Sequence, residues 1–214
     1  MTGATNHLKM LGLVAVAAAA LMAIAGIGTA SATVLCEEWE KPCPKAAVYE
    51  AGTQIEATLE SGTTSVFRQT GGTVLSTCTG STIKGKTTNA GGESEPVTGT
   101  IETMTFTGCT TVFTVIAAGA FEIKYLGPET LGSLTGKGTE LTVTILGVSC
   151  TYGTGAFTYM GKMTSSEVQL TPTIDLQALL AKRAGSFLCP GDVTWEASYT
   201  VTKPDPLFFK LKSA

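Results

Sequence analysis

The sequence predicts an all-β fold for residues 33–214, either an antiparallel β-sandwich or a barrel-like sheet. Threonine is abundant in this segment, and its β-branched side chain suits the half-solvated face of a strand. The chain contains 25 glycines, which favour turns and bulges between short strands. Runs of alternating apolar and polar residues recur, with turn signals between them. These three observations together indicate many short strands with polar outer faces.

The clearest strand is residues 193–201, where odd positions are apolar and even positions are polar. This pattern predicts one buried face and one solvated face. Strong breakers at 89–92 and at 127–128 separate neighbouring elements. The predicted strands are residues 54–59, 63–69, 73–79, 82–88, 97–107, 111–118, 120–126, 140–149, 156–162, 167–171, 193–202 and 207–212.

One short helix is predicted near residues 173–184. Thr171 can cap its start, Pro172 suits the first turn, and Gly185 can end it. Lys182 and Arg183 would lie in the last turn, where cations are favourable. The apolar residues recur at near-helical spacing: Ile174, Leu176, Leu179 and Leu180.

Residues 1–32 are predicted to be a signal peptide with a signal helix. The segment has a positive charge at Lys9, an apolar run over 10–28, and an Ala-Ser-Ala cleavage site that ends at Ala32. The mature chain would begin at Thr33 and form a single secreted β domain, residues 33–214. The alternative is an uncleaved membrane anchor, because the apolar run is about long enough to span a bilayer.

Six cysteines follow the predicted signal peptide. An even number of cysteines in an exported chain predicts a disulfide framework, which here has 15 possible connectivities. We expect sequential pairing, with the first pair closing locally around a proline-containing loop. The expected pairs are Cys36–Cys43, Cys78–Cys109 and Cys150–Cys189.

Composition excludes several classes of function. The only histidine is His7, so residues 33–214 can form no Ser-His-Asp or Cys-His site and have no imidazole metal ligand. The formal net charge of −3 and the absence of basic runs argue against nucleic acid as a partner. Membrane contact is expected only through the signal segment before cleavage. We expect no cofactor and no metal.

Two motif matches are predicted to be accidental. Residues 80–87 fit the phosphate-loop pattern, but the residues after them cannot form the helix that binds phosphate. Ser81 and Lys84 fit the Ser-x-x-Lys pattern of acyl enzymes. On a strand, these two side chains would point to opposite faces.

Carboxylate chemistry of the glycosidase kind is the catalytic possibility that remains. It requires two carboxylates facing each other across a cleft, whereas most acids here occupy the polar phase of predicted strands. The candidate pairs are Glu93 with Glu95, Asp192 with Glu196, and Glu102 with Glu122.

Four aromatic residues are candidates for stacking on a sugar or a protein partner. Trp195 lies on the inward phase of its strand, so core packing is favoured. Trp39 lies in the small loop between the first two cysteines and is the better candidate for a surface contact. Phe208 and Phe209 complete the set.

The C-terminal part resembles the ending of a group of secreted bacterial proteins of unknown function. The similarity rests on Cys189-Pro190, on Trp195-Glu196-Ala197-Ser198-Tyr199-Thr200-Val201, and on Pro204 and Pro206-Leu207. The threonine-rich region around Cys78 and Cys109 is similar as well. The resemblance implies export and a β-rich fold, and it implies no activity.

The sequence therefore favours a non-enzymatic structural or binding module of the cell envelope or extracellular space, with possible envelope or carbohydrate contact. The first alternative is a carboxylate-dependent, carbohydrate-active enzyme. The second is a binder of small apolar ligands. A cleft with two carboxylates about 5–10 Å apart would favour the enzyme. A large apolar cavity would favour the ligand binder.

Overall fold

A computed structural model describes residues 33–210, except 41, 94, 127–130 and 157. The predicted signal peptide and its cleavage site at Ala32 lie outside the described residues. All described residues belong to one compact unit, Ser31–Ala214. The strands are β1 Val34–Cys36, β2 Gln54–Leu59, β3 Ser65–Gln69, β4 Val74–Thr87, β5 Val97–Cys109, β6 Phe113–Ala117, β7 Ala120–Tyr125, β8 Leu131–Lys137, β9 Glu140–Ile145, β10 Val148–Gly153, β11 Thr158–Thr164, β12 Thr173–Ala184, β13 Val193–Lys203 and β14 Phe208–Lys210, with a 3₁₀ turn, η1, at Lys45–Ala47.

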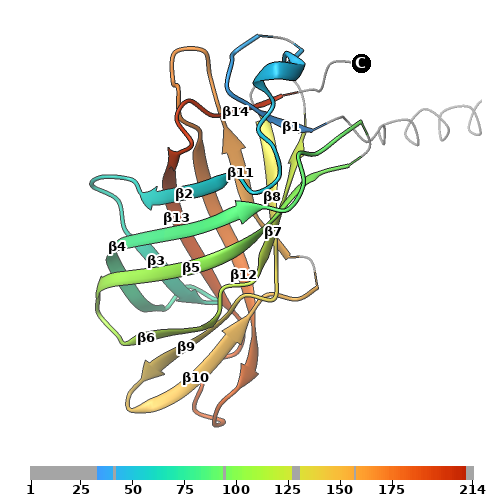
Figure 1. The fold of residues 1–214 in the computed structure, drawn as a ribbon. Helices are drawn as coiled ribbons and strands as arrows, with labels where there is room; N and C mark the ends of the chain where they lie inside the picture. Colours follow the sequence, from blue (N-terminus) through green and yellow to red (C-terminus); the bar gives the residue numbers. More distant parts are fainter. Residues whose placement is uncertain (1–32, 41, 94, 127–130, 157, 211–214) are drawn as a thin grey trace, which may run out of the picture. The chain divides into compact units, whose positions relative to one another are not determined.

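The predicted all-β, antiparallel fold is confirmed, because every pairing between these strands is antiparallel. The pairings run β4–β5–β7–β8–β11–β12–β13 and return from β13 to β4 through both β2 and β3. Strands β2 and β3 thus share one position and close a barrel-like sheet (Figure 1). Strands β10, β9 and β6 extend the sheet beyond the end of β12.

The prediction of a helix near residues 173–184 is wrong, because this segment is strand β12, Thr173–Ala184. The buried residues follow a two-residue period: Ile174, Leu176, Ala178 and Leu180. Leu179, which suggested a helical period, is 52% exposed on the outer face. Pairing with β11 on one side and β13 on the other outweighs the local capping signals.

Most predicted strands are confirmed, with four differences. Residues 73–79 and 82–88 form one continuous strand, β4. Residues 140–149 contain a turn at Leu146-Gly147 that separates β9 from β10. Residues 167–171 form no strand. Strands β1 and β8 were not predicted, because three residues are too few for a pattern and β8 is interrupted by Gly132 and Gly136.

Aromatic side chains fill one part of the sheet interior. Trp195 is fully buried, as predicted, and stacks on Phe67 with ring centroids 5.6 Å apart. Phe106 forms T-shaped contacts with both rings, and Phe113 from β6 packs against Phe67. Two buried hydroxyl groups satisfy polar atoms here: Trp195 Nε1 donates to Ser65 Oγ at 2.8 Å, and Tyr199 Oη to Ser81 Oγ at 2.8 Å.

The β1–β14 pair forms a separate small sheet at one end of this unit (Figure 1). Its strands pack Leu35 and Phe209 into the main core. The other side of the pair carries Phe208, which meets Trp39 edge to face at 5.3 Å. The ammonium of buried Lys210 lies 3.2 Å from the centroid of Trp39, a cation–π contact that holds the loop between the first two cysteines in place.

The three predicted disulfides are all confirmed: Cys36–Cys43, Cys78–Cys109 and Cys150–Cys189. The second joins directly opposed residues of β4 and β5. The third ties β10 to the loop between β12 and β13. Three disulfides indicate an oxidising compartment.

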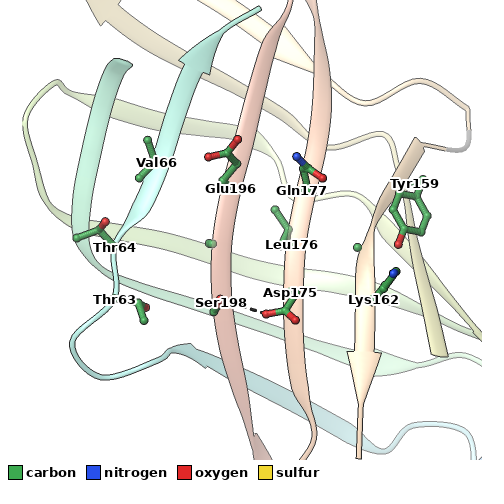
Figure 2. Close-up of a pocket in the computed structure, with 12 residues that line it drawn as sticks. Thr63, Thr64, Val66, Tyr159, Lys162, Asp175, Leu176, Gln177, Glu196 and Ser198 are labelled. Atoms are coloured by element: carbon green, nitrogen blue, oxygen red, sulfur yellow. Dashed lines mark hydrogen bonds between the residues drawn. The ribbon is translucent and has the colours of Figure 1, made fainter. Parts of the chain in front are cut away.

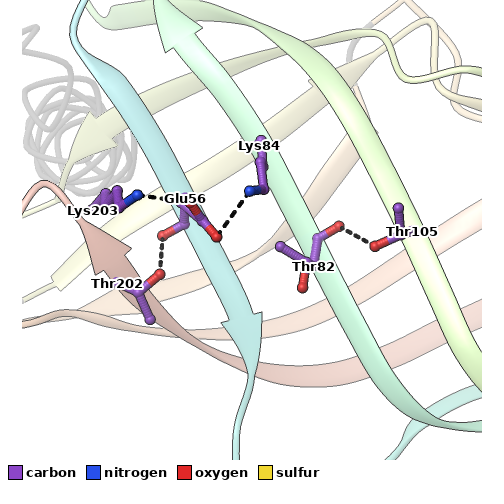
Figure 3. Close-up of polar contacts among 6 residues, drawn as sticks. All are labelled: Glu56, Thr82, Lys84, Thr105, Thr202 and Lys203. Atoms are coloured by element: carbon purple, nitrogen blue, oxygen red, sulfur yellow. Dashed lines mark hydrogen bonds and ion pairs between the residues drawn. The ribbon is translucent and has the colours of Figure 1, made fainter.

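Threonine and paired charges cover much of the outer face. Glu56 on β2 lies between two lysines, 3.2 Å from Lys84 Nζ on β4 and 3.5 Å from Lys203 Nζ on β13 (Figure 3). Cross-strand threonine hydroxyls also pair, at 3.0 Å between Thr142 and Thr151. Such pairs stabilise a sheet on its wet face and explain the threonine content.

Candidate functional site

The strongest candidate site is an open groove of about 510 Å³ on the outer face of β11, β12 and β13. Two rows of side chains cross it, as the strand register requires. One row is Lys162, Asp175 and Ser198, and the other is Gln177, Glu196 and Val66. Tyr159 stands on β11 at one side, and Thr63 and Thr64 lie at the other (Figure 2).

A bulge at Met160–Gly161 shapes this groove. The pairing of β11 with β8 shifts register between Tyr159 and Gly161, so Met160 and Met163 both point inward. Tyr159 and Lys162 consequently both lie exposed on the outer face. A Cβ atom at Gly161 would meet the Asp175 carbonyl oxygen at 2.1 Å. The missing side chain thus permits the close approach of β11 and β12 at this point.

Some groove side chains are held in place and others are available for a ligand. Arg68 Nε donates to Glu196 Oε2 at 3.0 Å, and Ser198 Oγ donates to Asp175 Oδ1 at 3.2 Å. Within the described part of the chain, no hydrogen bond uses the side chain of Tyr159, Gln177 or Lys162. The groove therefore presents a phenol, an amide and an ammonium beside two oriented carboxylates.

The carboxylate pairs predicted from the sequence do not face one another across this groove. Asp192 accepts the backbone N–H of Lys182 and does not line the groove, whereas Glu196 does. Glu102 and Glu122 are each bound to a different lysine, Lys86 and Lys124 respectively. Glu93 and Glu95 lie on either side of residue 94, which is outside the described residues, and neither lines the groove.

The carboxylate that does accompany Glu196 is Asp175, which the sequence analysis missed. Asp175 is opposite Ser198, two residues along β13 from Glu196. Diagonal neighbours of this kind lie about 7–8 Å apart. The signal was present in the alternation of polar and apolar residues over 173–178, which places Asp175 and Gln177 on the wet face once the segment is treated as a strand.

The two rejected motif matches lie on β4, as expected. Residues 80–87 are entirely within this strand. Ser81 points inward and is 4% exposed, whereas Lys84 points outward to Glu56. The Ser and Lys groups are therefore on opposite faces of one strand, where the lysine cannot activate the serine.

The interior contains a small apolar cavity of about 60 Å³, lined in part by Met104, Met160 and Met163. Sites for small molecules are typically about 300–1,000 Å³. This cavity does not favour the small-ligand alternative.

The four aromatic residues predicted as contact candidates differ in exposure. Trp195, Phe208 and Phe209 are at most 2% exposed and cannot stack on an external ligand. Trp39 is half-buried against Phe208 and Lys210, and its role in a surface contact stays a prediction. Tyr159, which is 48% exposed beside the groove, was not singled out by the sequence.

No family model, curated protein or solved structure matches this chain. Among the described residues, no helix is long and apolar enough to cross a membrane. The resemblance to secreted bacterial proteins remains a prediction.

Proposed function

We propose that this chain is an exported, non-enzymatic binding module of the cell envelope or extracellular space, and that the β11–β13 groove binds a hydroxyl-rich ligand of the carbohydrate class. The single observation that supports this proposal most is the chemistry of the groove. It places hydrogen-bonding groups from Asp175, Gln177 and Lys162 in two rows beside the exposed ring of Tyr159.

Sugars present several hydroxyl groups around an apolar ring face. Carboxylates and amides accept and donate to hydroxyl groups, and an aromatic ring can contact the apolar face. The groove is shallow and open, which suits one side of an extended polymer better than an enclosed small molecule. Export is supported by the three disulfides and by the predicted signal peptide.

The test is a binding screen of the exported, oxidised protein on an array of cell-wall and extracellular glycans, followed by calorimetric titration of any ligand found. Gln177→Ala should weaken binding about fivefold to tenfold, since one net hydrogen bond contributes about 1 kcal/mol. Gln54→Ala, which removes an exposed glutamine of β2 outside the groove, is the matched control. Binding that is unaffected by Gln177→Ala and by Tyr159→Ala would overturn the proposal.

A glycoside hydrolase is the second candidate, because Asp175 and Glu196 are two carboxylates at diagonal positions of neighbouring strands in one groove. Two features weigh against it. Glu196 is ion-paired with Arg68, and both carboxylates lie on an open polar surface, whereas a general acid needs an environment that keeps it protonated. Turnover of a bound glycan that is abolished by Asp175→Asn, with binding retained, would favour the hydrolase.

A further inference from the structure

We propose that the end of the sheet formed by the β9–β10 turn and the β12–β13 loop docks on a lipid bilayer, with Leu146, Phe187 and Leu188 inserted into it. This inference is independent of the groove, which lies on the outer face of β11–β13. These three side chains are named the apolar tips below.

The apolar tips are unusually exposed. Leu146 is 99% exposed, Phe187 92% and Leu188 64%. Val112, which is 69% exposed, lies beside Leu146 at the rim of the same surface hollow. Exposed apolar residues scattered singly are ordinary, but several gathered at one end of a molecule indicate a contact surface.

Leu146 also adopts an unfavourable backbone conformation. Leu146 has a φ of 49° and Gly147 a φ of 79°, the signs required by a two-residue type I′ turn. The first of these positions normally carries asparagine, aspartate or glycine, because other side chains are strained there. Leucine at this position contributes nothing to the core, which points to a role outside the folded chain.

The disulfide Cys150–Cys189 joins β10, which follows the β9–β10 turn, to the β12–β13 loop. Ala184, at the end of β12, pairs with Thr151, so the following loop continues alongside the start of β10. Gly185 packs so closely there that a Cβ atom would lie 3.0 Å from the Ser149 carbonyl oxygen. The turn bearing Leu146 is three residues before Ser149. The β9–β10 turn and the β12–β13 loop both lie at the lower end of the sheet in Figure 1.

The distribution of charge around the apolar tips favours a lipid bilayer as the partner. Residues 144–149 and 185–191 contain no charged side chain. Two cations lie behind the tips: Lys182 Nζ donates to the carbonyls of Ser186 and Cys189, and Arg183 Nη2 donates to that of Thr154. Asp192 is the acid nearest in sequence, and its carboxylate accepts the Lys182 backbone N–H. Uncharged apolar tips in front of cations match the order of acyl chains and phosphates at a membrane surface.

A protein partner fits less well. A stable protein interface buries about 800 Å² on each side and needs complementary shape and a polar rim. Two projecting loop tips with three large apolar side chains offer neither. A bilayer accepts projecting apolar groups without a preformed pocket.

The test uses protein recovered after export, with its amino terminus defined by intact mass. Phe187→Trp and Val168→Trp are compared in vesicles made from equal parts of phosphatidylcholine and phosphatidylglycerol, some with brominated acyl chains. Val168 is the matched control, since it is 94% exposed and belongs to the β11–β12 loop, outside the apolar tips. The indole at position 187 should shift to shorter wavelength and be quenched by bromine, while that at 168 should not. This site-specific signal holds whether or not the amino-terminal segment remains attached.

Vesicle partitioning supplies the second measurement. Phe187→Ser should lower the partition coefficient about tenfold, and Val168→Ser should leave it unchanged. No change in the indole at 187 on adding vesicles would overturn the proposal. So would burial of that indole without lipid in a concentration-dependent dimer, detected by sedimentation, because the occupant would then be a second copy of the chain.

Discussion

The hydroxyl groups of Tyr199 and Ser81 lie 2.8 Å apart inside the sheet, and join β13 to β4 through the core. Both residues are at most 4% exposed. Ser81→Ala leaves the tyrosine hydroxyl without this partner, and we expect a loss of about 1–3 kcal/mol in the free energy of unfolding. Chemical denaturation of both single variants and of Ser81→Ala with Tyr199→Phe measures the coupling. Strict additivity of the two single effects would contradict the expected interaction.

The same burial predicts instability in alkali. Burial raises the pKa of Tyr199 well above its ordinary value of 10.0, although the hydrogen bond with Ser81 opposes the shift. The folded state thus holds its proton more tightly than the unfolded state, so this stability is complete below about pH 10 and is lost as the pH rises further. Burial also raises the pKa of Tyr49 and of Tyr152. Thermal melts up to about pH 11 should show a steep fall, and Tyr199→Phe should make it shallower. An equally steep fall in that variant would assign the effect elsewhere.

We expect acid to lower the stability of the fold through Glu56, on the outer face. A hydrogen bond from Lys84 holds the pKa of Glu56 below its ordinary value of 4.5. The stabilising contribution is therefore present above that value and is lost as the pH falls through the lower, folded-state pKa. Glu56→Gln should lower the melting temperature slightly at neutral pH and have no effect in strong acid. A difference from the parent chain that persists in strong acid would show that the ion pairs with Lys84 and Lys203 are not its cause.

The disulfides should differ in what they contribute. Cys150 and Cys189 are 39 residues apart, whereas Cys36 and Cys43 are 7 apart. By the chain-entropy relation, replacing Cys150 and Cys189 with alanine costs about 4 kcal/mol, and replacing Cys36 and Cys43 costs about 2 kcal/mol. Denaturant titrations of the two double variants measure the difference. Equal losses would contradict the entropic account.

Gly161→Ala tests the local geometry of the groove. The added Cβ atom would meet the Asp175 carbonyl oxygen at 2.1 Å and force β11 and β12 apart. We expect a loss of about 1–3 kcal/mol in unfolding free energy and weaker ligand binding. Gly138→Ala serves as a comparison, since that position is sterically open, although its φ of 69° adds backbone strain. A stable Gly161→Ala variant would show that the close strand approach is not required.

Elements whose signal lies within one short stretch of sequence could be predicted, whereas features that depend on neighbouring strands could not. Alternation over 193–201 sufficed for β13, and cysteine order sufficed for the disulfides. The two-residue period was also present in β12. However, Leu179 on the wet face, together with Pro172 and Gly185, fitted the pattern of a helix. Only the neighbouring strands decide between the two readings.

The groove was beyond the reach of sequence reasoning for a similar reason. Its side chains come from β3, β11, β12 and β13, and their alignment follows from strand register and from the bulge at Met160–Gly161. Neither can be read from one chain without its pairings. The sequence pointed to Glu196 as a candidate carboxylate. Its neighbour in the groove, Asp175, is on the adjacent strand β12 and is distant in sequence.

The most direct test of the central claim is amide chemical-shift mapping of the isotope-labelled, exported protein titrated with soluble cell-wall and extracellular oligosaccharides. The proposal predicts saturable shifts at residues 159–162, 175–177 and 196–198, with the glycan recovered intact. Shifts confined to other faces of the sheet, or no shifts with any glycan of the panel, would contradict it.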